Sequence, residues 1–412
     1  MNEETSMSRR VVVVGGGLAG FTSAVTAAQL GADVLLLEAR ETVGGRARTN
    51  VVDGFAFNQG PHALYAASCG MRILNGLGIH PRGRKPPTAG GYGRYRGELG
   101  LLPGTSAPAL RSPLLGWRAK TQLARVLARP KKALATPTAG RSMRQWIDER
   151  VSDPGAVAAL SGLARLTTYV GDLDDLAADA AVPQLVSGLT DSVFYLDGGW
   201  AQLVDALRDK AVAAGVKIDT DAKVESLSEI EDADAVILAV GDPAQTARII
   251  GERSSVVQRW AADASPVVAA SLDLGLSHLP VPDRRFCLGL DDPLYFSVHS
   301  ASAALAPEGC ELLHVMQLGD PTDDTRAALE TFLDDVQPGW RACVLAERYG
   351  RRLVVSYDRP RPTRGIAGRP GPAILDCPGV FVAGDWVGDA GMLADASFAS
   401  GDGAARAALM IG

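Results

Sequence analysis

The chain has 412 residues, 47% hydrophobic and 21% charged, which is typical of a globular protein with room for two domains. Its net charge of −6 provides no basic field and argues against a main function in binding nucleic acid. The five cysteines form no Cys-x-x-Cys pair, and this scatter argues against a thiol redox relay. The start "MNEETSMSRR" is unlike a signal peptide, and no apolar run is long enough to cross a bilayer. We therefore expect a cytoplasmic protein.

The first predicted unit is a strand, a glycine-rich turn and a helix. Residues 11–14 read VVVV, as expected for a parallel strand covered on both faces, and residues 21–31 predict a helix that ends at a glycine. Between them, Gly15, Gly17 and Gly20 have the G-x-G-x-x-G spacing. The first two glycines allow a pyrophosphate to approach the backbone, and the third allows the helix to pack on the strand. The helix N-terminus offers free amides and the positive end of its dipole to the phosphates.

An acidic residue completes this unit. The second predicted strand, residues 33–37, ends at Glu38, where a carboxylate can accept hydrogen bonds from ribose hydroxyls. Strand, glycines, helix, strand and acid in this order predict a dinucleotide site. The neighbouring residues of the turn and of the acid are expected to line the same ligand: Leu18, Ala19, Ala39 and Arg40.

A second glycine pair narrows the ligand. The segment "ETVGGRART" places Gly44, Gly45 and Arg46 directly after the acid. It resembles the R-x-G-G-R-x-x-[ST] segment of the flavoprotein amine oxidase and phytoene desaturase superfamily, although Thr42 replaces the first arginine and Thr49 is kept. In that family the segment approaches the phosphates and ribityl chain of FAD, so the resemblance implies FAD.

Two later blocks extend the resemblance. "YLDGGWAQLVDALRDKAVAAGVKIDTDAKVESL", residues 195–227, contains a glycine pair, an amphipathic helix and an expected pair of strands. Family members use this block to complete the FAD domain, which implies a backbone contact to adenine near Val224. Residues 379–409 contain a strand that leads to Gly384 and Asp385.

The resemblance also assigns the last block. In the family such an acid binds the ribityl and phosphate region, and the following helix, expected to begin near Met392 and Leu393, faces the flavin N1 and O2 edge. Amides and the helix dipole there would stabilise negative charge on reduced flavin. Because this block contains no cysteine or histidine for a covalent link, we expect non-covalent FAD.

The predicted fold class is α/β, with a discontinuous Rossmann-like FAD-binding domain and a mixed α+β substrate-binding domain. The FAD domain is assigned to residues 1–60, 195–265 and 358–412, and the substrate domain to 61–194 and 266–357. No second G-x-G-x-x-G unit offers a site for a nicotinamide cofactor. Electrons from the flavin are therefore expected to pass to O2, a quinone, a carrier or a second substrate.

The segment "FNQGPHALY" follows at the distance where the family brings the chain to the flavin ring. Gly60 and Pro61 would shape that contact, and His62 would lie against the flavin. His62 and Tyr65 are the nearest polar candidates for orienting substrate or moving a proton, and His299 is a third candidate. A purely structural hydrogen bond from His62 to flavin or backbone is the alternative.

The second segment of the substrate domain, residues 266–357, contains a turn and several aromatic side chains that could line a cavity. "APEG", residues 306–309, resembles the A-P-x-G turn of bacterial phytoene desaturases. Tyr295 could line the substrate cavity or the core, as could His299, whereas Phe296 is expected in the core.

One departure from the family concerns the strand "VVAASLDLGL". Many amine oxidases carry a lysine there, which holds a water near flavin N5, but this chain has Ser271. The amine oxidase interpretation is thereby weakened. No metal-ligand or Ser-His-Asp spacing is evident, and the remaining histidines are interpreted as single residues: His80, His278 and His314.

The basic segment "LLGWRAKTQLARVLARPKKALA", residues 114–135, has leucines and a tryptophan among arginines and lysines. One interpretation is an amphipathic helix in peripheral contact with a membrane, and the simpler one is the solvated face of an ordinary helix.

These features predict an FAD-dependent oxidoreductase that dehydrogenates or oxidises a small to medium, largely apolar organic substrate by hydride transfer to flavin N5. One alternative is an amine oxidase without the usual lysine. Others are a non-redox flavoenzyme, such as a sugar-nucleotide mutase, and a flavin-free relative that resembles GDP dissociation inhibitors and binds lipidated partners.

Overall fold

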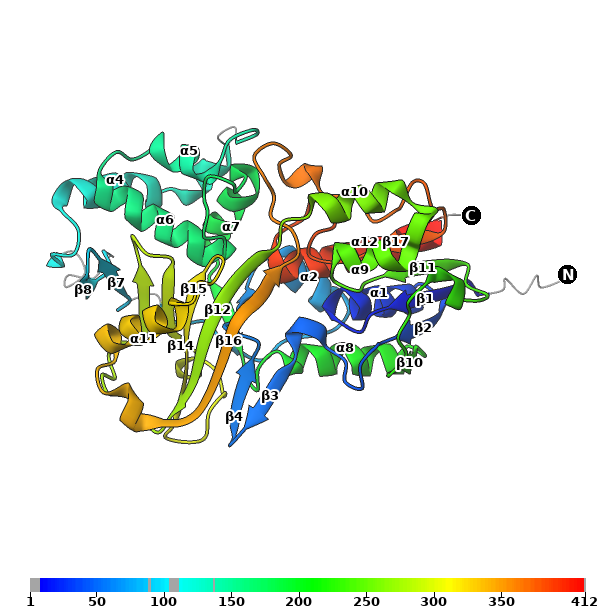
Figure 1. The fold of residues 1–412 in the computed structure, drawn as a ribbon, viewed down its shortest axis with the longest axis horizontal. Helices are drawn as coiled ribbons and strands as arrows, with labels where there is room; N and C mark the ends of the chain where they lie inside the picture. The colour runs from blue at the N-terminus through cyan, green and yellow to red at the C-terminus, as the bar shows by residue number, and fades with distance from the viewer. Residues whose placement is uncertain (1–7, 88–89, 104–110, 136–137, 411–412) are drawn as a thin grey trace, which may run out of the picture.

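The computed structural model describes residues 8–87, 90–103, 111–135 and 138–410. Figure 1 shows two halves, one built on a five-stranded parallel sheet and the other on a seven-stranded sheet. The chain passes between the halves more than once, so each half combines segments that are distant in the sequence. This arrangement agrees with the predicted α/β fold with a discontinuous first domain.

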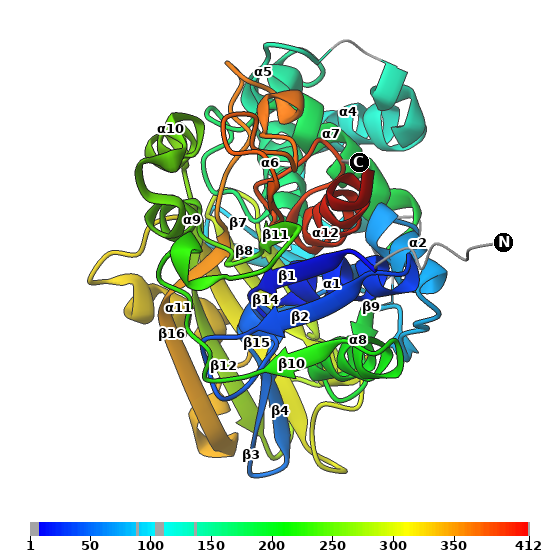
Figure 2. The same cartoon turned by 90° about the vertical axis from the view of Figure 1, so that its right-hand side faces the viewer.

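The parallel sheet forms the middle layer of the first half (Figure 2). Side chains alternate between the two faces of its central strand, β1. Val11 and Val13 face one hydrophobic cluster, and Val12 and Val14 face another. The first cluster lies under α1 (Leu18–Gln29), α8 (Ala201–Ala213) and α12 (Leu393–Met410), and the second under α9 (Pro243–Ile250) and α10 (Ser255–Asp263). The strand order is β10 (Lys217–Asp219), β2 (Asp33–Leu37), β1 (Arg10–Val14), β11 (Ala235–Leu238) and β17 (Val380–Val382).

The predicted elements of this half are largely confirmed. The strand at residues 11–14 and the strand at 33–37 are present, and the helix after the glycine turn begins at Leu18 rather than at Phe21. The prediction of a second strand directly after β10 is wrong. The amides of Asp221 and Ala222 donate to the carbonyls of Arg40 and Glu38, so the chain crosses the end of the sheet as a loop instead of pairing along it.

The seven-stranded sheet of the second half has two different faces. On β12, Ala270, Leu272 and Leu274 belong to a hydrophobic cluster shared with α11 (Thr325–Val336). Because side chains alternate along a strand, Ser271 and Asp273 point to the opposite face. The order is β16 (Val344–Ser356), β12 (Val267–Leu276), β15 (Glu311–Leu318), β14 (Leu294–Val298), β13 (Phe286–Gly289), β7 (Tyr92–Tyr95) and β8 (Glu98–Leu101).

Four helices from residues 61–194 cover one end of this half (Figure 1). They are α4 (Trp117–Leu127), α5 (Met143–Asp148), α6 (Pro154–Thr168) and α7 (Ala178–Thr190), and they share one hydrophobic cluster. In α4, Ala119 and Leu123 are buried in that cluster while Trp117 is 78% exposed. The inward apolar face agrees with an ordinary surface helix, and membrane contact by the basic segment stays a prediction.

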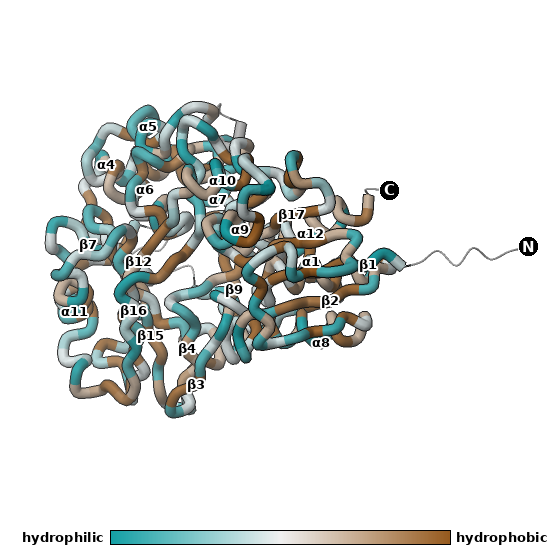
Figure 3. Tube along the Cα trace, turned by 45° about the vertical axis from the view of Figure 1, so that its right-hand side comes forward, coloured by the Kyte–Doolittle hydropathy of each residue, from teal (hydrophilic) through white to brown (hydrophobic). Residues whose placement is uncertain are grey.

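Short elements join the two halves. These are the hairpin β3 (Thr49–Val52) and β4 (Phe55–Asn58), a small sheet of β5 (Leu64–Tyr65), β9 (Val193–Leu196) and β6 (Gly83–Arg84), and helix α2 (Cys69–Gly76). Figure 3 shows hydrophobic segments in both halves, along β1 and β2 in the first and along β12 and β15 in the second. Within the described ranges, no helix has both the length and the apolar character required to span a bilayer.

Candidate cofactor and active site

At two positions in the glycine turn after β1, a side chain would clash with the backbone. Gly15 has φ +109°, and a Cβ there would lie 2.5 Å from the carbonyl oxygen of Ala239. A Cβ on Gly20 would lie 1.8 Å from the carbonyl oxygen of Gly15, so any side chain would separate α1 from the turn. These two predicted glycines are therefore required by the fold itself.

Gly17, at the N-cap of α1, is different. Its φ is −87°, which any residue can adopt, and no described atom lies within 4 Å of the position of a Cβ. A Cβ on Gly45 would lie 3.5 Å from the Cα of Gly17. The two glycines thus border an open cradle at a helix N-terminus, where backbone amides and the dipole favour an anion. This cradle fits the pyrophosphate of a dinucleotide.

Glu38 ties the turn to the following loop. Its Oε2 accepts a hydrogen bond from the amide of Gly16 at 2.7 Å, and its Oε1 accepts one from the amide of Arg40 at 3.0 Å. Val224 is buried at the same edge of the sheet, in a cluster with Val12 and Val14. Glu38 therefore has backbone amides as its partners in this structure, and the expected contacts of Glu38 and Val224 with the cofactor stay predictions.

An ion pair between a partly exposed arginine and a buried aspartate connects the second glycine segment to the last block. Nη1 of Arg46 lies 2.8 Å from Oδ2 of Asp385, whose side chain is 2% exposed, and also donates to the carbonyl of Val355 at 2.9 Å. Gly384 is fixed by Ser400, whose Oγ donates to its carbonyl and accepts from its amide. The two segments expected to contact FAD thus meet in space.

Gly60 lies against the polar face of the seven-stranded sheet. A Cβ at Gly60 would lie 3.7 Å from the Cβ of Ser271 and 3.4 Å from the Cε of Met316. Next to it, Nδ1 of His62 lies 3.0 Å from the carbonyl oxygen of Gly60, and its ring packs edge-on against Trp200 at 4.9 Å. Burial lowers the pKa of His62 to about 4. The imidazole is therefore neutral near pH 7, with its Nδ1 proton donated to the backbone.

Beside Gly60 lies a set of buried polar side chains, here called the Asp273 cluster: Ser271, Asp273 and His314. Oδ1 of Asp273 accepts from Oγ of Ser271 at 2.5 Å and lies 2.8 Å from Nδ1 of His314. All three residues are at most 1% exposed. The prediction that His314 stands alone is wrong, because the antiparallel pairing of β12 with β15 places it directly opposite Asp273.

The predicted residue His299 extends this cluster. Its ring stacks on Tyr195 at 4.1 Å and meets the ring of His314 edge-on at 4.5 Å, and its Nε2 lies 3.4 Å from the hydroxyl of Tyr295. Burial lowers the pKa of His299 well below its ordinary value. His299 is 1% exposed, as buried as its neighbours Tyr295 and Met316.

Tyr65, the third predicted catalytic residue, is anchored to α6. Its hydroxyl donates to the carbonyl of Thr167 at 2.8 Å, and burial raises the pKa of the phenol. A neutral, tethered phenol is suited to orienting a neighbouring group and unsuited to giving up its proton.

An apolar wall lies on the same face of the sheet. One hydrophobic cluster brings Tyr295 and Met316 of the sheet into contact with Tyr169 at the end of α6. Phe296 points to the other face and is fully buried in the core, as predicted. The cluster comprises Ala269, Tyr295, Met316 and Leu318, with Leu166, Tyr169, Phe286 and Val355 packed against them.

The start of α12 is conformationally unusual. Leu393, its first residue, has φ +56°, and Gly391 has φ +73°. Asp395 in the first turn accepts from Oγ of Ser68 at 2.6 Å and from the amide of Gly70 at 3.2 Å, which attaches this helix end to the segment that follows Tyr65. The predicted helix start at Met392 and Leu393 is therefore adjacent to the segment expected to meet the flavin ring.

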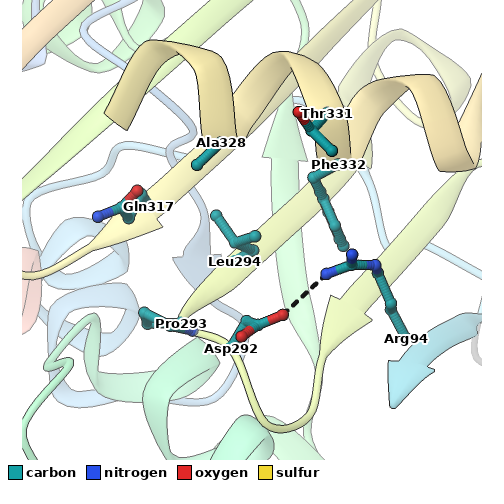
Figure 4. Close-up of a pocket in the computed structure, with 8 residues that line it drawn as sticks. All are labelled: Arg94, Asp292, Pro293, Leu294, Gln317, Ala328, Thr331 and Phe332. Carbon is teal, nitrogen blue, oxygen red and sulfur yellow. Dashed lines mark hydrogen bonds and ion pairs between the residues drawn. The ribbon is translucent and has the colours of Figure 1, made fainter. Parts of the chain in front are cut away.

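The pocket in Figure 4, of about 320 Å³, lies elsewhere. It is bordered by α11 and by Arg94, which pairs with Asp292 at 2.8 Å. Its residue Gln317 pairs with Ala270, on the face of the sheet that packs on α11. The pocket therefore opens on the side of the sheet opposite to the Asp273 cluster, and we do not assign it to the active site.

Sequence reasoning missed Asp273 and His314. A signal was present: His314 interrupts the apolar strand "ELLHVMQL", and Ser271 and Asp273 have the spacing of two residues that share a strand face. Which histidine meets which acid depends on strand register, which the sequence alone did not supply. Among the described residues, no group of three or more His, Cys, Asp and Glu side chains could hold a metal ion.

Comparisons with known proteins support the interpretation of the glycine segments. Residues 18–273 match the family model described as flavin containing amine oxidoreductase. Coproporphyrinogen III oxidase of Propionibacterium freudenreichii is 25% identical, with 88% of this chain and 78% of that protein covered. Carotenoid 3,4-desaturase of Haloarcula japonica is 27% identical over 56% of this chain and 53% of that protein.

Solved structures show the same fold. An oxidoreductase from Methanosarcina mazei has a TM-score of 0.73 at 20% identity, with 95% of this chain and 98% of that chain covered. Cyclohexylamine oxidase from Brevibacterium oxydans has a TM-score of 0.68 at 13% identity, with 97% and 98% covered. The chain belongs to the flavin-containing amine oxidoreductase family and is an FAD-dependent oxidoreductase.

Proposed function

We propose that FAD lies along the end of the parallel sheet, bound without a covalent link in the half formed by residues 1–60, 195–265 and 358–412. The open cradle between Gly17 and Gly45 supports the phosphate position, and the meeting of Arg46 with Asp385 supports a path toward the ring. The substrate would then lie between this half and the half formed by residues 61–194 and 266–357.

Each predicted contact has a physical role in this proposal. The first-turn amides of α1 bind the pyrophosphate, and Glu38 accepts from the ribose while it holds the turn. Asp385 accepts from the ribityl hydroxyls and Arg46 offsets its charge. Gly60, Pro61 and His62 border the ring, and the remaining contacts are made by backbone at Leu18, Ala19, Ala39, Arg40, Gly44, Val224, Gly384, Met392 and Leu393.

We propose that the substrate is a small to medium, largely apolar organic molecule that is dehydrogenated at carbon. The observation that carries this proposal is the wall of Tyr295, Met316 and their apolar neighbours on the sheet face next to Gly60. Such a wall binds a ligand mainly through area removed from water, about 25 cal/mol per Å². The carboxylate of Asp273 on this face is already held by Ser271 and His314.

Dehydrogenation at carbon releases a proton together with a hydride, and bound FAD supplies the acceptor for the hydride. The proton requires a base. When Asp273 accepts the Nδ1 proton of His314, the lone pair of this imidazole is on Nε2, and Nε2 has no hydrogen-bond partner within the described part of the chain. We propose that His314 holds the released proton, while His62, Tyr65 and His299 orient the substrate and exclude water around it. Electrons then leave to O2 or a carrier.

The runner-up is oxidation of an amine without the usual lysine. Its support is the group of aromatic rings around His299, because an amine cation binds well on aromatic faces. The two functions separate in an anaerobic stopped-flow panel of primary amines, polyamines, amino acids, isoprenoids and polycyclic compounds. Fast flavin bleaching by an isoprenoid or polycyclic compound supports the proposal, and fast bleaching by an amine with release of ammonia or an aldehyde contradicts it.

The role of His314 is tested with His314→Asn, whose amide can still donate to Asp273 but offers no Nε2 lone pair. With the substrate found in the panel, we expect about 10²–10⁴-fold slower flavin bleaching and unchanged FAD content. His80→Asn, on the surface, is the control. Equal rates in His314→Asn and the wild type would remove His314 from the mechanism.

A further inference from the structure

The strongest unassigned feature is the guanidinium of Arg369. This residue is 7% exposed, and its Nη1 donates to the carbonyl of Gly391 at 2.9 Å. Its Nε and Nη2 are buried and have no hydrogen-bond partner among the described residues. Buried N–H groups of a guanidinium are costly to leave unpaired, so their partner is expected to be a ligand group.

The nearby carboxylates are not hydrogen-bond partners of Arg369. Asp385 lies within electrostatic range of Arg369 but is hydrogen-bonded to Arg46, and Asp358 is bonded to Arg364 at 3.0 Å. Asp179, also within range, accepts from the amide of Ile366. Because burial is the main influence on Arg369, its pKa is lowered from the ordinary value. The group therefore carries a desolvated positive charge whose donors remain available.

The position of this charge is set by α12. Gly391, which accepts from Arg369, stands just before the first residue of this 18-residue helix, Leu393. The helix dipole is positive at this end, although the amides of Asp395 and Ala396 already donate to the carbonyl of Met392. Asp395 joins the same helix end to Ser68, in the segment that follows His62 and Tyr65. Two independent positive features thus converge beside the expected position of the flavin ring.

The family resemblance already places the N-terminus of α12 at the N1 and O2 edge of the flavin. We propose that Arg369 adds a fixed positive charge at this edge and thereby sets the reduction potential of the cofactor. This inference rests on the proposed FAD position. Bound FAD, once reduced by two electrons, would carry negative charge at N1 and O2. A fixed guanidinium there favours the reduced anion over the neutral oxidised form.

The test is the midpoint potential of the purified holoenzyme, measured by dye-equilibrated anaerobic reduction, for the wild type, Arg369→Gln and Arg369→Lys. Arg369→Gln removes the charge and is expected to lower the equilibrium constant for FAD reduction about 10–100-fold, which corresponds to about 30–60 mV for a two-electron couple. Arg369→Lys keeps the charge and is expected to recover most of the potential. Arg364→Gln, in the same segment but paired with Asp358, is the matched control and is expected to match the wild type.

Each other outcome overturns the proposal. Equal potentials in Arg369→Gln and the wild type would show that the charge does not act on the ring. Equal shifts in the Gln and Lys variants, or loss of FAD from both, would indicate a packing or retention role. The measurement uses no substrate, so failure of the apolar-substrate proposal leaves it unaffected. A wild-type protein that takes up no FAD would instead contradict the FAD assignment itself.

Discussion

The glycine turn after β1 and the Asp273 cluster are two polar sites near the interface of the halves, and they are built in opposite ways. The turn omits side chains at Gly15, Gly17 and Gly20 and offers backbone to a ligand. The cluster instead buries side chains of Ser271, Asp273 and His314 against one another. Backbone amides bind a ligand without burying a charge of their own, whereas a buried carboxylate requires its partners at all times. A change at Gly17, where a side chain has room, should therefore affect the ligand, and changes in the cluster should affect the fold.

The largest expected effect comes from breaking the cluster. His314→Leu removes the imidazole from Asp273 and leaves that buried carboxylate with Ser271 as its remaining partner. We expect the free energy of unfolding to fall by about 3–5 kcal/mol in urea titrations. The surface variant His80→Leu should lose far less, because this side chain is exposed and its hydrogen-bond partner is the nearby side chain of Asn75. Similar losses in the two variants would show that the buried pair is unimportant.

A second effect depends on pH and concerns Asp395 at the start of α12. Burial raises the pKa of this carboxyl from 3.8 to about 6, so the folded chain binds more protons than the unfolded chain between these values. The contribution of Asp395 to the free energy of unfolding is fully present below pH 3.8 and is lost as pH rises through about 6. The free energy of unfolding falls by about 3 kcal/mol over this range.

Asp395→Asn removes this titration but keeps an oxygen for Ser68 and Gly70. The variant is expected to lose the decline in stability between pH 4 and pH 6 and to be more stable than the wild type at pH 7. Urea midpoints at several pH values measure this. An unchanged pH profile in the variant would assign the wild-type decline to another group.

A smaller effect is expected at the charged contacts of FAD. Glu38→Ala and Asp385→Ala each remove a carboxylate that we propose accepts from cofactor hydroxyls. Charge-assisted hydrogen bonds of this kind are worth about 1.5–3 kcal/mol, so FAD affinity should fall by about one to two orders of magnitude. Flavin absorbance after dilution and gel filtration gives the retained fraction, and full retention in both variants would contradict the assigned contacts.

The difference between the two sites also decides what could be predicted from sequence. The turn leaves a fixed local spacing of glycines that can be recognised in the sequence. At Gly20 the atom that excludes a side chain is the nearby carbonyl oxygen of Gly15, whereas at Gly15 it is the carbonyl oxygen of Ala239, which is distant in the sequence. The Asp273 cluster depends on residues 41 positions apart, Asp273 and His314, that are joined only by the register of β12 and β15. The strand "VVAASLDLGL" was predicted correctly, but its partner histidine was not.

The paths of loops also depend on contacts between residues that are distant in the sequence, so they could not be predicted from local patterns. The segment after β10 was expected to pair as a strand, yet the amides of Asp221 and Ala222 bond to the loop after β2. Arg369 likewise had no local signal, since its position depends on contact with Gly391. The turn at residues 306–309 was expected from its resemblance to the A-P-x-G turn of phytoene desaturases, and Gly309 does have φ +79°.

The most direct test of the FAD assignment is the affinity of Gly17→Ala for FAD. No described atom lies within 4 Å of the added Cβ, so the apoprotein should lose at most about 1 kcal/mol at this N-cap. The methyl group would enter the cradle proposed for the pyrophosphate. Gly116→Ala is the matched control, because Gly116 is also an N-cap glycine with no described atom within 4 Å of its Cβ position. We predict at least about tenfold weaker FAD binding for Gly17→Ala, about 1.4 kcal/mol, with wild-type affinity for Gly116→Ala. Equal FAD affinity in the two variants would contradict the cofactor position on which this account depends.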